Sequence, residues 1–107
     1  MILVISPSKT LDFTGPQYPD YTLPEMLEKS RQLSDGLKKL TPGQVGDLMG
    51  ISKKLAQLNW QRYQDFSVPF SPANARQALF AFKGDVYSGL AAETFSEDDL
   101  AFAQDHV

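Results

Sequence analysis

The sequence predicts a mixed α/β fold in which several short helices surround two short strands. The first strand is the run 1–5, which is entirely apolar and partly β-branched and stops at Ser6-Pro7. The second lies near 79–83, where four apolar residues precede a lysine and a glycine. Because a strand that is apolar on both faces needs cover on both, we expect the first strand to be buried.

The length of the chain sets a limit on this architecture. With 107 residues, of which 42% are hydrophobic, residues 1–107 can form one small domain. Two strands do not make an independently stable sheet, and the last predicted helix has no glycine or proline that would end it. We therefore expect this domain to be the N-terminal part of a longer protein.

The first predicted helix follows a loop. Residues 10–20 contain one glycine and two prolines, which is typical of a loop. Thr22 and Glu25 then have the spacing of a capping box, in which each side chain bonds the backbone of the other residue. Apolar residues recur at helical spacing from there to Leu40, so one face of this helix should be buried.

Further capping signals follow along the chain. Thr41-Pro42-Gly43-Gln44 predicts a capped helix over 42–49, and a second helix should run from Ser52 to about residue 66. Ser71-Pro72 predicts a short helix that ends near residue 78. Ser96 and Asp99 form another capping box, which begins the final helix.

The segment 48–56 resembles a helix-hairpin-helix motif, a DNA-binding pair of helices joined by a tight turn. Gly50 can adopt the positive φ that such a turn needs, and Ser52 can cap the following helix. Lys53 and Lys54 then begin that helix, where free backbone N–H groups attract phosphate. The motif's usual proline is Met49 here. The alternative is an ordinary two-helix turn with a glycine bend.

The charges are distributed unevenly. The net charge is −3, but residues 29–62 contain seven basic residues against two acidic ones, a net charge of +5, which leaves −8 elsewhere. Such a split is typical of an anion-binding surface, and Arg62 would extend the contact from the hairpin. The alternative is that these lysines and arginines only line solvent-exposed helix faces.

Composition excludes several kinds of site and compartment. The chain has no cysteine and one histidine, so neither thiol chemistry nor a histidine-rich metal site is available. We expect no metal and no cofactor. No apolar run approaches the roughly 20 residues that span a membrane, and the N-terminus lacks a secretory layout, so we expect a cytoplasmic protein without membrane contact.

A second candidate site follows the two predicted strands. If the strands are neighbours, the polar side chains just beyond their carboxyl ends would surround one cleft. Two lysines there would bind a phosphate or a carboxylate, and the aspartate would act as a base. Alternatively, Lys9 forms a structural salt bridge and the tyrosine only packs. The cleft residues would be Ser6, Lys9, Thr10, Lys83, Asp85 and Tyr87.

The order of these segments resembles the bacterial YaaA family of peroxide stress proteins. The segments that carry the resemblance are 5–11, 48–56, 74–78, 81–90 and 92–95, and they extend over most of the chain. The resemblance implies a cytosolic α/β protein with a helix-hairpin-helix element within 42–66. It also implies binding of DNA, branched forms included, and protection from peroxide through limitation of free iron. It places the hairpin role on Gly50, Ser52, Lys53 and Lys54.

Two functions of different classes follow from these patterns and from the family resemblance, which alone implies the stress role. The first is a DNA-binding protein of the oxidative stress response, whose hairpin holds the phosphate backbone of duplex or branched DNA without sequence preference. The second is an enzyme that acts on a phosphorylated or nucleic-acid substrate between Lys9, Lys83 and Asp85. We favour the first, because the hairpin and the basic segment coincide.

Overall fold

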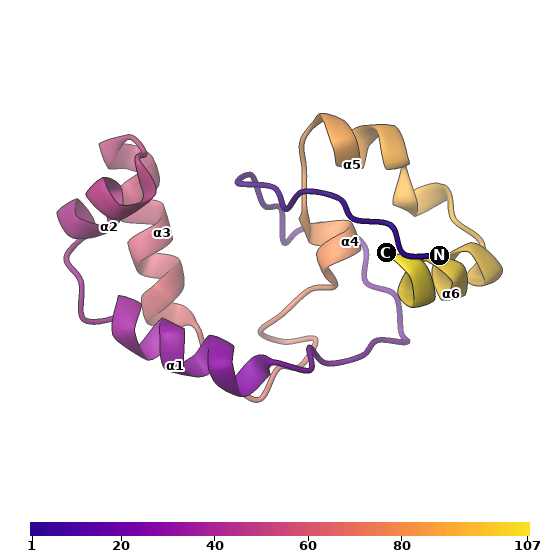
Figure 1. Ribbon diagram of the computed structural model, residues 1–107, viewed down its shortest axis with the longest axis horizontal. Coiled ribbons are helices and arrows are strands. Elements are labelled where there is room, and N and C mark those ends of the chain that lie inside the picture. The colour runs from indigo at the N-terminus through magenta and orange to yellow at the C-terminus, as the bar shows by residue number, and fades with distance from the viewer. The chain divides into compact units, whose positions relative to one another are not determined.

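The protein is helical. A computed structural model describes all residues 1–107 and contains no β-strand, whereas 51% of the residues are in helices. The predicted α/β class is therefore wrong. The elements, shown in Figure 1, are α1 (Leu27–Leu37), α2 (Pro42–Met49), α3 (Lys53–Asp65), α4 (Ala78–Ala81), α5 (Asp85–Leu90), the 3₁₀ helix η1 (Ala92–Thr94) and α6 (Glu97–His106).

The chain divides into two compact units that differ in charge. One unit is Thr22–Ser71, which contains α1, α2 and α3 and has a net charge of +2. The other combines Met1–Tyr21 with Pro72–Val107 and has a net charge of −5. We call them the basic unit and the acidic unit. The predicted hairpin region 42–66 lies entirely in the basic unit.

The N-terminal run 1–5 forms no strand. Its side chains are largely exposed, with Met1 at 81%, Ile2 at 82% and Val4 at 92% of their full accessible area. The Leu3 N–H donates to the carbonyl of His106 at 2.6 Å, which ties this run to the end of α6. A strand needs a neighbour that pairs its backbone groups, and none is present.

The second predicted strand is wrong for a related reason. Ala78–Ala81 forms a helical turn, in which the N–H of Phe82 donates to the carbonyl of Ala78 at 3.0 Å. Alanine favours helix, and local hydrogen bonds satisfy the backbone when no partner strand exists. Only an isolated antiparallel bridge between Leu11 and Phe82 has sheet character.

Two predicted helix starts are also wrong. The helix expected from Thr22 begins only at Leu27, and its N-cap, Met26, has no side-chain cap. The exposed side chains of Leu23 and Met26 have no core to pack against, so nothing favours an earlier start. The segment after Ser71 forms turns rather than a helix. The Pro72 carbonyl accepts from the Gln17 and Arg76 side chains instead of a helical N–H.

Candidate nucleic-acid interface

The α2–α3 hairpin is capped as its sequence predicts. Thr41 and Gln44 form the complete capping box at the start of α2. Gly50 ends α2 in the left-handed region, at φ 61° and ψ 44°. The Ser52 hydroxyl then accepts from the N–H of Leu55 at 3.3 Å, which caps α3. Local chemistry alone therefore fixes both ends of the turn.

Small residues let α2 and α3 approach closely. Val45 is fully buried and Ala56 is 3% exposed, and these residues form the core of the pair. A Cβ atom added to Gly46 would lie only 3.1 Å from the Cβ of Ala56. The sequence analysis did not identify Gly46, although a glycine among helical residues is itself a signal of close packing.

Side chains of α3 fix it against the end of α1. The Trp60 indole donates to the carbonyl of Leu40 at 2.9 Å, and the Gln64 amide donates to the carbonyl of Lys38 at 3.0 Å. In return, Lys38 Nζ donates to the carbonyl of Phe66 at 2.8 Å. These bonds provide donors for carbonyl groups that have no helical N–H partner, at and just beyond the ends of α1 and α3. Trp60 is half-buried, and its bond to Leu40 gives it a structural role.

The start of α3 presents donors and charge together. Ser52, Lys53 and Lys54 are all exposed. Helix geometry leaves the first N–H groups of α3 without a helical acceptor, and those of Lys53 and Lys54 have no other acceptor within the chain. The positive end of the helix dipole adds to the two ammonium charges there. This arrangement can hold a phosphate oxygen.

Arg62 lies away from this turn. It belongs to the last turn of α3, is half-buried and takes part in an interaction within the chain. Nine residues separate it from Lys53, so the helical rise places it about 14 Å further along the axis. The structure thus brings Gly50, Ser52, Lys53 and Lys54 together, but not Arg62.

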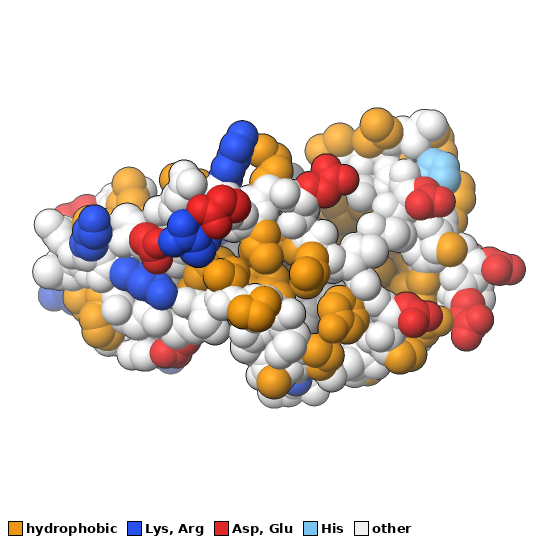
Figure 2. Space-filling view, turned by 90° about the horizontal axis from the view of Figure 1, so that it is seen from below, with side chains coloured by type: hydrophobic (Ala, Val, Ile, Leu, Met, Phe, Trp, Pro, Cys, Tyr) orange, Lys and Arg blue, Asp and Glu red, His pale blue; other side chains and the backbone are white.

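Ion pairs reduce the free positive charge of the basic unit. Arg31 pairs with Glu28 at 2.6 Å and with Asp35 at 2.8 Å along the exposed side of α1. In the space-filling view, blue basic side chains over this unit have red acidic ones directly beside them (Figure 2). Hydrogen bonds from Arg31 and Gln32 lower the pKa of Glu28 to about 2. The unpaired positive charge therefore comes mainly from lysines.

The second candidate site lies in the acidic unit. The Tyr87 hydroxyl donates to the carbonyl of Ser6 at 2.8 Å, and the Lys83 N–H donates to the carbonyl of Thr10 at 3.0 Å. The two polar segments therefore do meet. Lys83 and Tyr87 line a cavity of about 380 Å³. Lys9 and Asp85 do not line it, and Asp85 instead begins α5. The enzymatic role of this cleft stays a prediction.

Asp12 has a lowered pKa, and hydrogen bonds from Thr14 and the charge of Lys83, a residue that lines the cavity, are among the causes. The Thr14 hydroxyl and N–H donate to its carboxylate at 2.6 and 2.8 Å, and these bonds lower its pKa. The positive charge of Lys83 lowers it further. The Lys83 ammonium therefore interacts with a carboxylate of its own chain.

The structure groups no three His, Cys, Asp or Glu side chains in an arrangement that would hold a metal ion. None of its helices has the length and apolar character that crossing a membrane requires.

The fold and this geometry define a helical protein with a capped, lysine-bearing hairpin in one unit and an acidic second unit. The family model described as "Peroxide stress protein YaaA" matches residues 1–107, which is the whole chain. The chain therefore belongs to the YaaA family of peroxide stress proteins, and the resemblance seen in its sequence is confirmed.

Proposed function

We propose that this chain binds the phosphate backbone of DNA, duplex or branched, through the turn between α2 and α3. The observation that carries the proposal is the start of α3. There, after a glycine in the left-handed region and a serine cap, the N–H groups of Lys53 and Lys54 have no acceptor within the chain and lie on two residues with exposed side chains. In the family's stress role, the chain would act on DNA in the cytoplasm and protect it by limiting free iron.

The chemistry of this site favours phosphate over base edges. Backbone N–H groups and lysines bind phosphate oxygens, which carry no sequence information. A single hairpin contacts few phosphates, so its affinity should be modest and should fall as salt rises. The net charge of +2 on the basic unit supports the approach of an anionic partner.

A charge-reversal experiment tests this function. The double variant K53E/K54E should lose at least about 10-fold in affinity for duplex DNA at low salt, since it places two like charges near a phosphate. The loss should be the same for duplexes of unrelated sequence and should extend to a four-way junction. Fluorescence anisotropy with labelled DNA measures all of these affinities.

The double variant K29E/K39E is a matched control. Lys29 and Lys39 are exposed in the same unit, and reversing them changes the net charge of the chain by the same amount. This variant should keep most of the affinity. If K53E/K54E binds as wild type does, or if both double variants lose affinity equally, the hairpin is not the DNA site.

A further inference from the structure

The only sulfur atoms of this chain belong to three methionines, because it has no cysteine. Met1 and Met26 are 81% and 61% exposed, and no hydrogen bond engages either sulfur atom. Met49 differs, because it is half-buried and is the last residue of α2, directly before the turn at Gly50. Met49 is therefore the only methionine of the α2–α3 hairpin.

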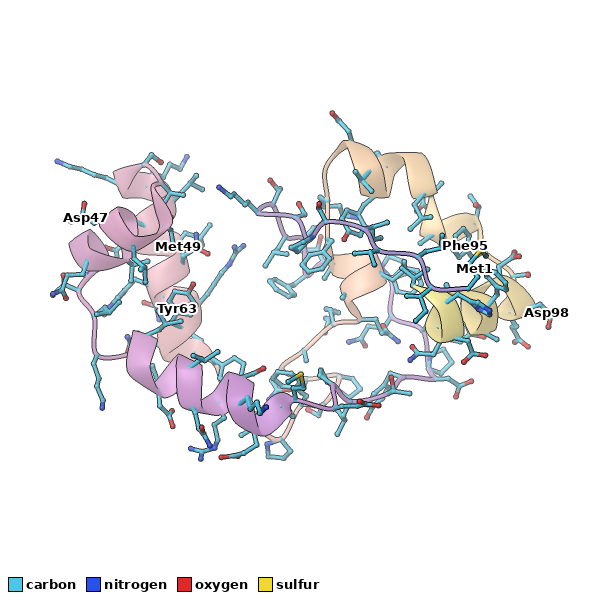
Figure 3. All side chains as sticks on the ribbon, in the orientation of Figure 1. Met1, Asp47, Met49, Tyr63, Phe95 and Asp98 are labelled. Carbon is cyan, nitrogen blue, oxygen red and sulfur yellow. The ribbon has the colours of Figure 1, made fainter.

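The sulfur atom of Met49 links the two helices of the hairpin. The Tyr63 hydroxyl on α3 donates to Met49 Sδ, at the end of α2, at 3.5 Å, and both residues are labelled on the hairpin in Figure 3. Tyr63 is also half-buried. A thioether is a weak acceptor, so the contact depends on the close approach of the helices that Gly46 and Ala56 permit.

We propose that Met49 is a peroxide-oxidised site that loosens the α2–α3 hairpin. A lone pair of Sδ attacks one oxygen of hydrogen peroxide and the O–O bond breaks. The sulfur is oxidised by two electrons to the sulfoxide, while the second peroxide oxygen leaves with the electron pair of the O–O bond, takes the proton of the transferred hydroxyl and becomes water. Peroxide is a small molecule, and Met49 is half-buried rather than buried.

The added oxygen changes the contact across the hairpin. The sulfoxide is polar and bulkier than the thioether, and Sδ and the Tyr63 oxygen are only 3.5 Å apart. An oxygen added on the side of Sδ that faces Tyr63 fits only if the two side chains move apart. Because Met49 is followed by Gly50 and Ser52, this movement shifts the turn and the start of α3. If the turn binds DNA as proposed above, oxidation should also weaken that binding. This consequence rests on the proposed function, whereas the structural change does not.

Peroxide treatment of the full chain and of two variants tests this proposal. M49L keeps the volume but removes the oxidisable sulfur, and M26L is the matched control at an exposed methionine. Peptide mass spectrometry gives the oxidation of each methionine, and the fluorescence of Trp60, the only tryptophan, reports the packing of α3. Treated wild type and M26L should shift in emission and lose roughly 4 °C of thermal midpoint. Treated M49L should do neither, and methionine sulfoxide reductases should reverse both effects.

Two results would overturn the proposal. One is that Met49 stays reduced after Met1 and Met26 are fully oxidised. The other is that treated M49L shifts as much as wild type does. Anisotropy with labelled DNA on the same samples separates the two proposals. If no sample binds DNA, the proposed function fails, while a shift confined to samples that contain Met49 still supports oxidation of the hairpin.

Discussion

Gly50 allows the turn of the hairpin because its backbone can adopt a positive φ. It has a φ of 61°, and a Cβ atom placed there would meet nothing within 4 Å. Any cost of a side chain at this position is therefore conformational rather than steric. An L-residue in the left-handed region costs about 1–2 kcal/mol, and asparagine tolerates that region better than most residues do.

Because the cost at Gly50 is conformational and not steric, alanine should change the free energy of unfolding in opposite directions at Gly50 and Gly36. Gly50→Ala should lower the free energy of unfolding by about 1 kcal/mol, because it strains φ. Gly36→Ala, in the last turn of α1 with nothing within 4 Å, should raise it by up to about 0.5 kcal/mol, because the end of a helix gains less than its interior. Urea denaturation followed by Trp60 fluorescence measures both changes. Equal effects at the two sites would contradict this explanation of the turn.

The Glu28 carboxylate depends on Arg31. Hydrogen bonds from that guanidinium are the main reason that the pKa of Glu28 is lowered to about 2, against an ordinary value of 4.5. The pKa is lower in the folded chain, so the pair stabilises the fold above pH 4.5. This contribution is lost as the pH falls through about 2. Both partners are exposed, so salt should weaken the pair.

Replacing the guanidinium should restore the ordinary acidity of Glu28. In Arg31→Gln, the pKa of Glu28 should rise toward 4.5, as measured by an NMR titration of its carboxyl carbon. Lys29→Gln removes one neighbouring positive charge but no hydrogen bond, so the pKa should stay near 2. A Glu28 pKa that is the same in wild type and Arg31→Gln would show that Arg31 is not the cause.

At the scale of elements, the hairpin depends on the fit between α2 and α3. Val45 is the only large side chain of the protein that is fully buried, and Ala56 lies against Gly46 with no room for a larger group. Close-packed contacts of this kind resist added volume, because extra atoms force side chains or backbone to move.

A leucine at position 56 should therefore separate the two helices. Ala56→Leu should lower the free energy of unfolding by about 1–3 kcal/mol. Gln57→Leu introduces the same side chain at the next, exposed position of α3, and its effect should stay within about 0.5 kcal/mol. Urea denaturation gives both values. If the two variants were equally stable, the close approach of α2 and α3 would not be required.

The helix caps show which elements a sequence can predict. Thr41 with Gln44, Ser52, and Ser96 with Asp99 all cap the helices that they were expected to cap. A cap involves side chain and backbone groups within a few residues, so its chemistry is largely local. The box predicted for Thr22 and Glu25 is the exception, because the helix begins only at Leu27. The bounds of α2 and α3 followed from the same signals.

The prediction of two strands was wrong because a strand depends on a partner that is distant in the sequence. An apolar, β-branched run such as 1–5 is compatible with a strand, but only a neighbouring strand satisfies its backbone. The expected neighbour contains Ala78 and Ala81, and its backbone bonds locally as a helical turn. The contact of Gly46 with Ala56, and that of Met49 with Tyr63, are also tertiary and left only weak signals in the sequence.

At the scale of the whole molecule, the charge division found in the sequence coincides with the two compact units. The basic unit contains seven of the ten lysines and arginines, and the acidic unit contains eight of the thirteen acidic residues. Within the basic unit, Arg31 is neutralised by two carboxylates and Lys38 donates to a backbone carbonyl. Lys53 and Lys54 are therefore the exposed charges that also adjoin free N–H groups.

The salt dependence of DNA binding tests this central claim most directly. Each phosphate neutralised on duplex DNA contributes about −0.9 to the slope of log K against log salt. The variant K53Q/K54Q should therefore show a slope smaller in magnitude by about 2 than that of wild type, at any duplex sequence. The variant K29Q/K39Q should keep the wild-type slope. An unchanged slope in K53Q/K54Q, or the same reduction in both variants, would contradict phosphate binding at the start of α3.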